Sequence, residues 1–165
     1  MKQILFATEN RSKATRFSKG LLEKEIEIVS LKDLNIKLEI EETGTTAIEN
    51  ARIKAKAGYE KTHMPTIGMD DTLYMENVPE EKQPGLYVRR IKGKTLNDDE
   101  MIEYYTNLVK QYGTDGRLNC KWVYGLVAID KEGKESTYTW SKDDFYMVDT
   151  LSRKDGSRLS FEHDF

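Results

Sequence analysis

Apolar and polar positions follow two different periods along the first thirty residues. The stretch QILFAT is a compact apolar strand, and EIEIVSL, which begins at Glu25, alternates apolar and charged residues as a half-buried strand does. Between the two strands Asn10 is a good N-cap, and apolar residues recur at helical spacing behind it, at Ala14, Phe17 and Leu21. The pattern predicts a strand, a helix and a second strand.

Three further elements are predicted between residues 36 and 75. IKLEIEE, from Ile36, repeats the alternation less strictly and predicts a third strand. Thr46 and Glu49 have the spacing of a capping box, and small or apolar residues then keep one helical face until His63, which predicts a helix. TIGMDDTLYM is a short β-friendly run with two carboxylates inside it, and a turn-rich loop follows.

The second half of the chain predicts one helix and one long hairpin. Asn97 and Glu100 form another cap pair, and an apolar stripe continues from there to Gly113. RLNCKWVYGLVAID and KESTYTWSKDDFYMVD are β-rich runs on either side of a tight turn at 131–133. Strands and helices alternate in the first half and an antiparallel hairpin follows, so the fold class is α/β with a mixed sheet.

Composition narrows the size and class of the protein. With 165 residues, of which 38% are hydrophobic and 33% charged, the chain is predicted to form one domain over 1–165, with a loose polar tail over 150–165. A net charge of −3 without a basic stripe argues against nucleic-acid binding. The apolar start is too short to cross a membrane. One cysteine and two histidines exclude a zinc cluster and suit a reducing cytoplasm.

The loop FATENRSK places cations at the start of a helix, where the helix dipole disfavours them. Arg11 and Lys13 lie in the first turn, which exposes unpaired N–H groups and a partial positive charge. A phosphate beside Thr8, Asn10 and Lys13 would reverse the sign of that interaction. Alternatively, both cations are solvated and Asn10 is a plain cap.

Carboxylates gather in two separate stretches of the sequence. Glu39, Glu41 and Glu42 precede the second helix, and Asp70 and Asp71 interrupt an apolar strand. Since neighbouring strand residues point to opposite faces, only one of the two aspartates can face a given site. Carboxylates brought together need a cation between them, and an oxygen-only set favours Mg²⁺. The alternative is a solvated strand end and a turn. The guanidinium groups of Arg89 and Arg90 could reach a phosphate, or both could be solvated at the surface.

Taken together, these blocks resemble the inosine triphosphate pyrophosphatase family. FATENRSK is similar to the family's strand and Thr-x-Asn-x-x-Lys loop, and EETGTTAIENARIKA is similar to its Glu-Glu-x-Gly-x-Thr helix entry. MDDTLYM and PGLYVRR are similar to its Asp-Asp-Ser-Gly-Leu strand and Pro-Gly-x-Tyr-Ser-x-Arg segment. The resemblance covers about the first ninety residues. It implies an elongated mixed sheet flanked by helices, with a central nucleotide cleft.

The resemblance also implies an activity and its residues. The family hydrolyses non-canonical purine nucleoside triphosphates (ITP, dITP, XTP) to the monophosphate and pyrophosphate, with Mg²⁺, as a cytoplasmic homodimer. In this chain Glu42 and Asp71 would hold the metal, and Asp71, or Asp70 if it faces the site, would be the general base. The substrate-binding residues would be Thr8, Asn10, Arg11, Lys13, Lys54, Thr72 and Arg90.

The C-terminal third departs from the family pattern. The family's late Phe-Gly-Tyr-Asp-Pro loop has only a trace in Phe145, Tyr146 and Asp149, and the GSR at 156–158 is too short to be identified with its Ser-His-Arg residues. Phe145, Tyr146 or Trp140 could stack on a base, or each could be a packed strand aromatic. Two rival interpretations follow: a family member that binds nucleotides without turnover, and an α/β interaction domain with a surface acidic cluster.

Overall fold

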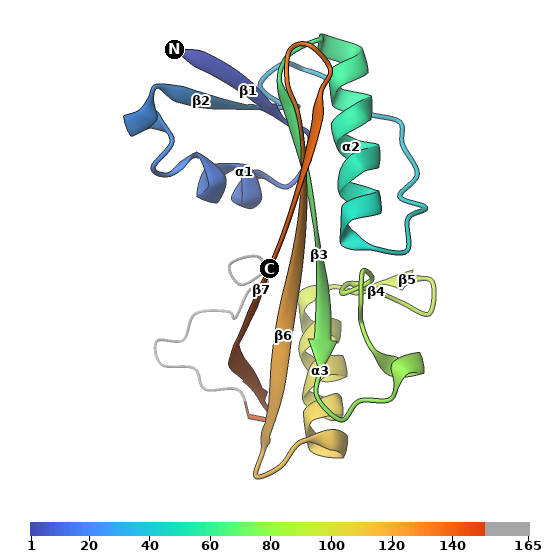
Figure 1. Ribbon diagram of the computed structural model, residues 1–165. Coiled ribbons are helices and arrows are strands. Elements are labelled where there is room, and N and C mark those ends of the chain that lie inside the picture. The colour runs from blue at the N-terminus through green and yellow to red at the C-terminus, as the bar shows by residue number, and fades with distance from the viewer. Residues whose placement is uncertain (151–165) are drawn as a thin grey trace. The chain divides into compact units, whose positions relative to one another are not determined.

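The computed structural model describes residues 1–150 as two compact units (Figure 1). The first unit comprises Met1–Asp71 and Tyr124–Trp140, and the second comprises Thr72–Val123 and the described residues from Ser141 onward. Three long strands contribute residues to both units. The predicted loose tail lies outside the described residues from 151 onward, and so does the 156–158 segment. The prediction of one domain over 1–165 stays a prediction.

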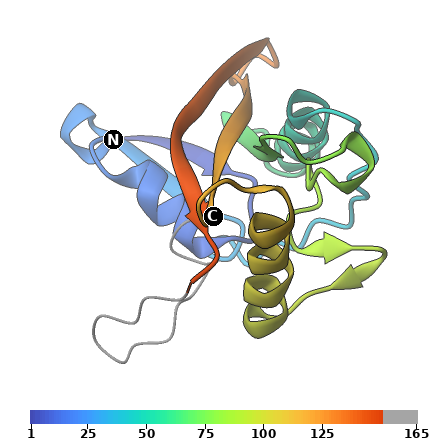
Figure 2. The same cartoon turned by 90° about the horizontal axis from the view of Figure 1, so that it is seen from below.

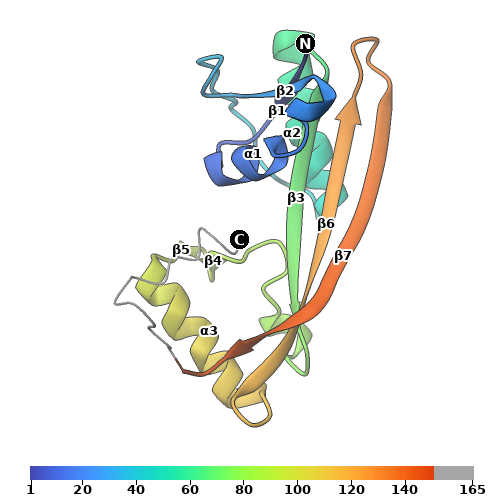
Figure 3. The same ribbon diagram turned by 90° about the vertical axis from the view of Figure 1, so that its left-hand side faces the viewer.

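A five-stranded sheet carries the fold, in the order β2-β1-β3-β6-β7. Its strands are β1 (Lys2–Phe6), β2 (Ile26–Ser30), β3 (Thr66–Met75), β6 (Arg117–Ile129) and β7 (Glu135–Val148). β1 is parallel to both β2 and β3. Figure 3 shows that β6 and β7 run in opposite directions from the turn that joins them. The predicted α/β fold with a mixed sheet is therefore confirmed.

Helix α1 (Arg11–Ser18) covers one face of the sheet in the first unit. Its apolar side places Ala14 and Phe17 against a buried cluster of strand residues, Phe6, Ile67 and Leu126. The rings of Phe6 and Phe17 lie 5.3 Å apart. A short 3₁₀ turn (Leu22–Lys24) then leads into β2. The predicted strand, helix and strand at the start of the chain are confirmed.

Helix α2 (Ala47–Thr62) covers the opposite face and lies unusually close to the strands. Ala51 and Ala55 pack against Val127 and Ile129 of β6. Gly68 of β3 allows the close approach, because a Cβ there would lie 2.2 Å from the carbonyl oxygen of Ala51. The predicted helix, with Thr46 as its cap and its end before His63, is confirmed.

The strand predicted from Ile36 was wrong. Residues 36–44 form no helix or strand. The apolar residues of this segment are used for packing, since Ile36 and Leu38 contact the cluster of Leu5, Val29 and Leu31. Alternation here therefore reflects a segment that half-buries every second side chain, at Ile36, Leu38 and Ile40, without forming a strand of the sheet.

The second unit contains the remaining elements, η2 (Glu80–Lys82), β4 (Arg90–Ile91), β5 (Lys94–Thr95) and α3 (Asp98–Tyr112). Figure 2 shows the β4–β5 ribbon beside α3, where Arg89 and Asp98 form an ion pair of 3.1 Å. Asn97 caps α3 by accepting from the backbone N–H of Glu100. The predicted third helix is confirmed. Among the described residues, no helix is long and apolar enough to cross a membrane.

Candidate active site

The loop between β1 and α1 is organised by short side chains. Thr8 Oγ1 accepts from the backbone N–H of Asn10 at 3.1 Å, and Asn10 Oδ1 accepts from that of Lys13 at 3.2 Å. Asn10 thus caps α1 and uses one of its free N–H donors. Arg11 is exposed at the first position of the helix. Thr8, Asn10, Arg11 and Lys13 therefore share one helix entrance, as the sequence predicts.

The Lys13 side chain is paired with a carboxylate on the sheet. Its Nζ lies 2.9 Å from Asp71 Oδ2, and the two side chains are only 17% and 13% exposed. Asp71 Oδ1 is buried and has no hydrogen-bond partner among the described residues. Lys13 is therefore partly buried and ion-paired, not simply solvated. The buried oxygen leaves the site ready to accept a proton or a cation, since an unpaired buried acceptor is costly.

A second lysine gathers three oxygen groups on the α2 face. Lys54 Nζ lies 3.1 Å from Glu42 Oε1 and 3.6 Å from Asp70 Oδ1. It also donates to the backbone carbonyl of Met69 at 3.1 Å. An ammonium has three N–H donors, so these contacts can occupy all of them. Lys54 therefore lies between Glu42 and Asp70. From the sequence, Glu42 is expected to lie with Asp71 instead.

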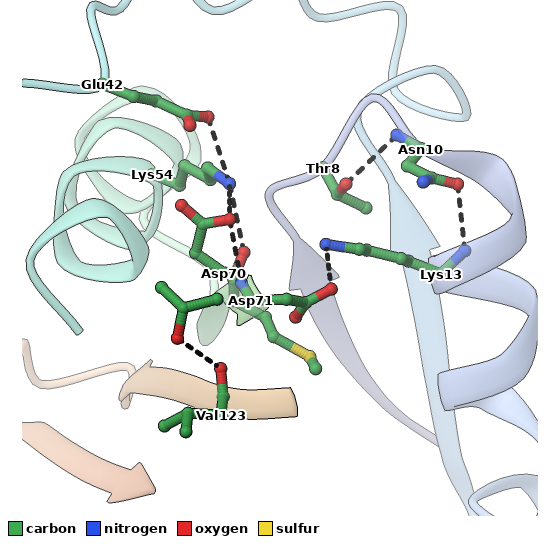
Figure 4. A network of polar contacts seen from close by, with 10 residues as sticks. Thr8, Asn10, Lys13, Glu42, Lys54, Asp70, Asp71 and Val123 are labelled. Carbon is green, nitrogen blue, oxygen red and sulfur yellow. Dashed lines mark hydrogen bonds and ion pairs between the residues drawn. The ribbon is translucent and has the colours of Figure 1, made fainter. Parts of the chain in front are cut away.

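Strand alternation explains why the two aspartates have different lysines. Figure 4 shows Asp70 pointing toward Lys54 of α2 and Asp71 pointing toward Lys13 of α1. The two residues remain linked, because Asp70 Oδ1 accepts the backbone N–H of Asp71 at 2.9 Å. One strand thus carries both carboxylates, and the first unit brings together Glu42, Asp70 and Asp71 with two ammonium groups.

The loop that carries Glu42 is fastened to the start of α2 by a buried amide. Asn50 is 2% exposed, and its Oδ1 accepts the backbone N–H of Gly44 at 2.8 Å. A Cβ on Gly44 would lie 2.5 Å from the same oxygen, so the loop is seated tightly. Sequence reasoning missed this role of Asn50. Its signal is an amide one position after the capping-box glutamate, in the interior of a helix.

Replacing Asn50 with leucine should loosen this loop. The change keeps the branching at Cγ but leaves the Gly44 N–H without its acceptor, so we expect a loss of about 1–3 kcal/mol in the free energy of unfolding. Urea unfolding measures it. The exposed Asn35, at a left-handed φ of 53° in the turn that directly follows β2, offers an Asn→Asp control that should change the free energy far less. Equal effects of the two changes would contradict the role of Asn50.

Glu49 makes the same loop sensitive to acid. The pKa of Glu49 is lowered from 4.5, first by the backbone N–H of Thr45 and then by the Thr45 hydroxyl. Both groups contact Glu49 Oε2, at 2.6 Å and 3.0 Å.

A carboxylate whose pKa is lowered in the folded state stabilises that state above its unfolded pKa, and the gain is lost as the pH falls through the lowered value. The melting temperature of the native protein should therefore exceed that of Glu49→Gln at pH 6, and the difference should shrink as the pH falls from 4.5 toward 3. A difference independent of pH would contradict the assignment.

Two predicted site residues belong to the second unit. Thr72 is buried and donates its hydroxyl to the carbonyl of Val123 at 3.1 Å, so its hydrogen is already used within the sheet. Arg90 is exposed on β4 and pairs with Thr95 across the two-stranded ribbon. Their contact with substrate remains a prediction.

The donor set of the first unit suits a hard cation. The carboxylates present only oxygen, and Asp71 Oδ1 is buried without a partner. Within residues 1–150 no three His, Cys, Asp or Glu residues are placed to hold a metal ion by themselves. Mg²⁺ commonly takes only one or two carboxylates and completes its shell with water and phosphate oxygens, so the residues fit it when a phosphate is present.

Comparison with known proteins assigns the family. Residues 4–141 match the Ham1 family, and the chain belongs to it. It is similar to a dITP/XTP pyrophosphatase of Oceanobacillus iheyensis, with 34% identity over 139 residues, which is 84% of this chain and 68% of the relative. A dITP/XTP pyrophosphatase of Leptospira interrogans is 38% identical over 98 residues, 59% of this chain and 49% of that relative. The resemblance found in the sequence is thereby confirmed.

Solved structures agree on the fold. A HAM1 protein from Coxiella burnetii has a TM-score of 0.70 at 23% identity, and the match covers 94% of this chain and 78% of that one. The Ham1 protein of Staphylococcus aureus has a TM-score of 0.68 at 23% identity, covering 94% and 77%. The matched part of the chain spans between about half and two thirds of its curated relatives.

Proposed function

We propose that this protein hydrolyses non-canonical purine nucleoside triphosphates such as ITP, dITP and XTP to the monophosphate and pyrophosphate. The observation that carries the proposal is the ion pair of Lys13 with Asp71 at the entrance of α1, with the second oxygen of Asp71 buried and unpartnered. A cation, free helix N–H groups and a carboxylate acceptor meet there. Family membership and the names of the relatives support the same activity.

The phosphates are held at the start of α1. The backbone N–H groups there and the side chains of Thr8, Asn10 and Arg11, all at the entrance of α1, are the proposed phosphate contacts. Lys13 uses one of its three N–H donors on Asp71, which leaves two for phosphate oxygens. Lys54 can donate to a phosphate only by releasing one of its present partners. Thr72 and Arg90, which belong to the second unit, remain predicted substrate contacts.

Asp71 is the proposed general base. Its Oδ1 accepts a proton from a water molecule whose oxygen attacks the α-phosphorus. The bond from that phosphorus to the oxygen bridging it to the β-phosphorus then breaks, and pyrophosphate leaves with the bridging oxygen. Lys13 holds the Asp71 side chain in place before attack through their ion pair. Asp70 orients the backbone of Asp71 through its N–H.

Glu42 and Asp71 are the proposed Mg²⁺ ligands. Glu42 lies with Asp70 at Lys54, and Asp71 lies with Lys13 on the other face of β3, so the proposed metal binds where the side chains of Glu42 and Asp71 have left their lysines. A bound Mg²⁺ would neutralise triphosphate charge and polarise the phosphoryl oxygens. Before the nucleotide and the metal bind, each of these two carboxylates is paired with a lysine, Asp71 with Lys13 and Glu42 with Lys54. This arrangement supports a metal that binds together with the nucleotide.

A pyrophosphate-release assay tests the function. Purified protein is incubated with ITP, XTP, ATP and GTP, first with Mg²⁺ and then with EDTA. Metal-dependent release from ITP and XTP, well above that from ATP and GTP, is the expected result. Tight binding without release would instead favour a family member without turnover, and neither binding nor release would favour an interaction domain.

The proposed setting is a cytoplasmic homodimer. Cys120 is the single cysteine of the chain and a buried free thiol, and the lack of an internal disulfide is usual for proteins of a reducing compartment. Light scattering of the purified protein tests whether it is a dimer, and a monomeric mass under assay conditions would contradict this prediction.

A further inference from the structure

An exposed tryptophan lies on the polar outer strand β7. Every residue from Glu135 to Asp144 is exposed, and most are polar or charged. Trp140 is 41% exposed, and its ring stacks on Tyr124 of β6 with centroids 5.3 Å apart and planes 20° from parallel. One face of the indole is therefore supported by Tyr124 while much of its surface stays open to a ligand.

Strand register places this aromatic pair in line with Asp71. The backbone N–H of Glu76 donates to the carbonyl of Asn119, and the Thr72 hydroxyl donates to that of Val123. The residue numbers in the first pair add up to the same total as those in the second pair. Both pairs therefore belong to one antiparallel register, in which residues of β3 and β6 with that total lie opposite each other. One further step along β3 and β6 sets Asp71 opposite Tyr124.

The turn between β6 and β7 extends the same row. Asp130 N–H donates to the Lys134 carbonyl, and this register sets Tyr124 opposite Trp140, as their stacking confirms. Directly opposite residues of antiparallel strands share a face. Asp71, Tyr124 and Trp140 therefore form a row across three strands of the first unit.

Packing identifies which face carries the row. Gly125 faces α2, because a Cβ there would lie 2.7 Å from the backbone nitrogen of Ile48. Tyr124 precedes it and faces the α1 side, with Leu126. The pKa of Tyr124 is raised by burial and then by the negative charge of Asp71, in agreement with this placement. The indole thus shares the face on which Lys13 meets Asp71.

We infer that Trp140, supported by Tyr124, is the stacking surface for the purine base of the nucleotide. The inference rests on the proposed function, because it takes the phosphates to lie at Lys13 and Asp71. Neighbouring strands are about 4.8 Å apart, so Trp140 lies about 10 Å across the sheet from Asp71. A nucleotide with its α-phosphate at Asp71 can extend its base along the row. Aromatic stacking is tolerant of base identity, and exclusion of canonical bases belongs to other contacts.

Tryptophan fluorescence tests the contact without altering Trp140. The chain has two tryptophans, and Trp122 is buried, so a Trp122→Phe variant reports on Trp140 alone. An α,β-methylene analogue of ITP with Mg²⁺ should quench its emission, whereas inorganic tripolyphosphate with Mg²⁺ should not. Equal quenching by both, or none by the nucleotide analogue at saturation, overturns the inference. Saturation is established independently by calorimetry.

Kinetics provide the second arm. Trp140→Leu should raise the KM for ITP by roughly 5- to 100-fold, with kcat changed little, because stacking serves ground and transition state alike. Trp140→Phe should retain most of the affinity. Tyr138→Leu is the matched control, since Tyr138 is 57% exposed on the same strand face but lies two residues nearer the hairpin turn.

The outcomes separate the two proposals. If the native protein releases pyrophosphate but the Trp140→Leu variant has the same KM for ITP, the stacking role of Trp140 is wrong and the proposed function stands. A native protein that releases no pyrophosphate loses the proposed function, and the quenching experiment still decides the base contact. A fall in melting temperature equal in Trp140→Leu and Tyr138→Leu, with KM raised in neither, would make Trp140 a packing residue only.

Discussion

Replacing Asp71 with asparagine is expected to lower pyrophosphate release from ITP by about 10²- to 10⁴-fold, the usual contribution of a positioned general base. Asparagine is nearly isosteric and its amide oxygen can still accept from Lys13 Nζ, which lies 2.9 Å from the carboxylate in the native protein. The basic oxygen is lost, so proton acceptance fails while the side chain keeps its place. Steady-state kinetics with ITP and Mg²⁺ measure the change.

Asp70→Asn is the matched control for that experiment. Asp70 lies next to Asp71 on the strand, is equally buried and also contacts a lysine, but on the opposite face. Its loss should reduce kcat less than the loss of Asp71. A larger effect at Asp70 would transfer the base role to it, and unchanged turnover in Asp71→Asn would remove Asp71 from catalysis.

Replacing Lys54 with methionine should destabilise the protein by about 3 kcal/mol in the absence of divalent metal. The Lys54 and Asp70 side chains are each 13% exposed, so the change leaves a largely buried carboxylate, and Glu42 beside it, without a cation. Mg²⁺ should then recover part of the loss by taking the place of the ammonium. Urea unfolding in EDTA and in Mg²⁺ gives both free energies.

Lys61→Met serves as the control for this prediction. Lys61 is on the same helix, but it is exposed, and its contact with the Lys37 carbonyl is long, at 3.4 Å. Its replacement should change the free energy of unfolding by a few tenths of a kcal/mol at most. If Mg²⁺ stabilises the native protein and Lys54→Met equally, the cation site beside Lys54 is wrong.

Much of the fold could be predicted because local signals and burial agree. The caps at Asn10, Thr46 and Asn97 each accept the backbone N–H three residues on, as the sequence indicates. The two β-rich runs around the 131–133 turn form the expected hairpin. In these elements, periodicity is the direct result of one face packing on the core.

Other features depend on pairing that no local pattern records. Ile36 and Leu38 alternate as a strand would, yet the segment finds no place in the sheet. The sequence places Glu42, Lys54 and the two aspartates in the site, but the choice of Asp70 for Lys54 depends on which way β3 faces. The contact of Asn50 with Gly44 spans six residues and follows from the path of a loop.

Asp70 and Asp71 contact lysines on opposite faces of β3, so the register of this strand determines which lysine each aspartate meets. Deleting Met69, the residue between Gly68 and Asp70, would exchange the faces of the two aspartates if the start of the strand kept its register. If the end of the strand kept its register instead, Ile67 would take the place of Gly68, where the carbonyl of Ala51 leaves no room for a side chain. Removing two residues would restore the alternation but shorten the reach of the strand. Protein engineers who graft or permute this fold should therefore place their junctions outside β3, because its length and parity together define the chemistry.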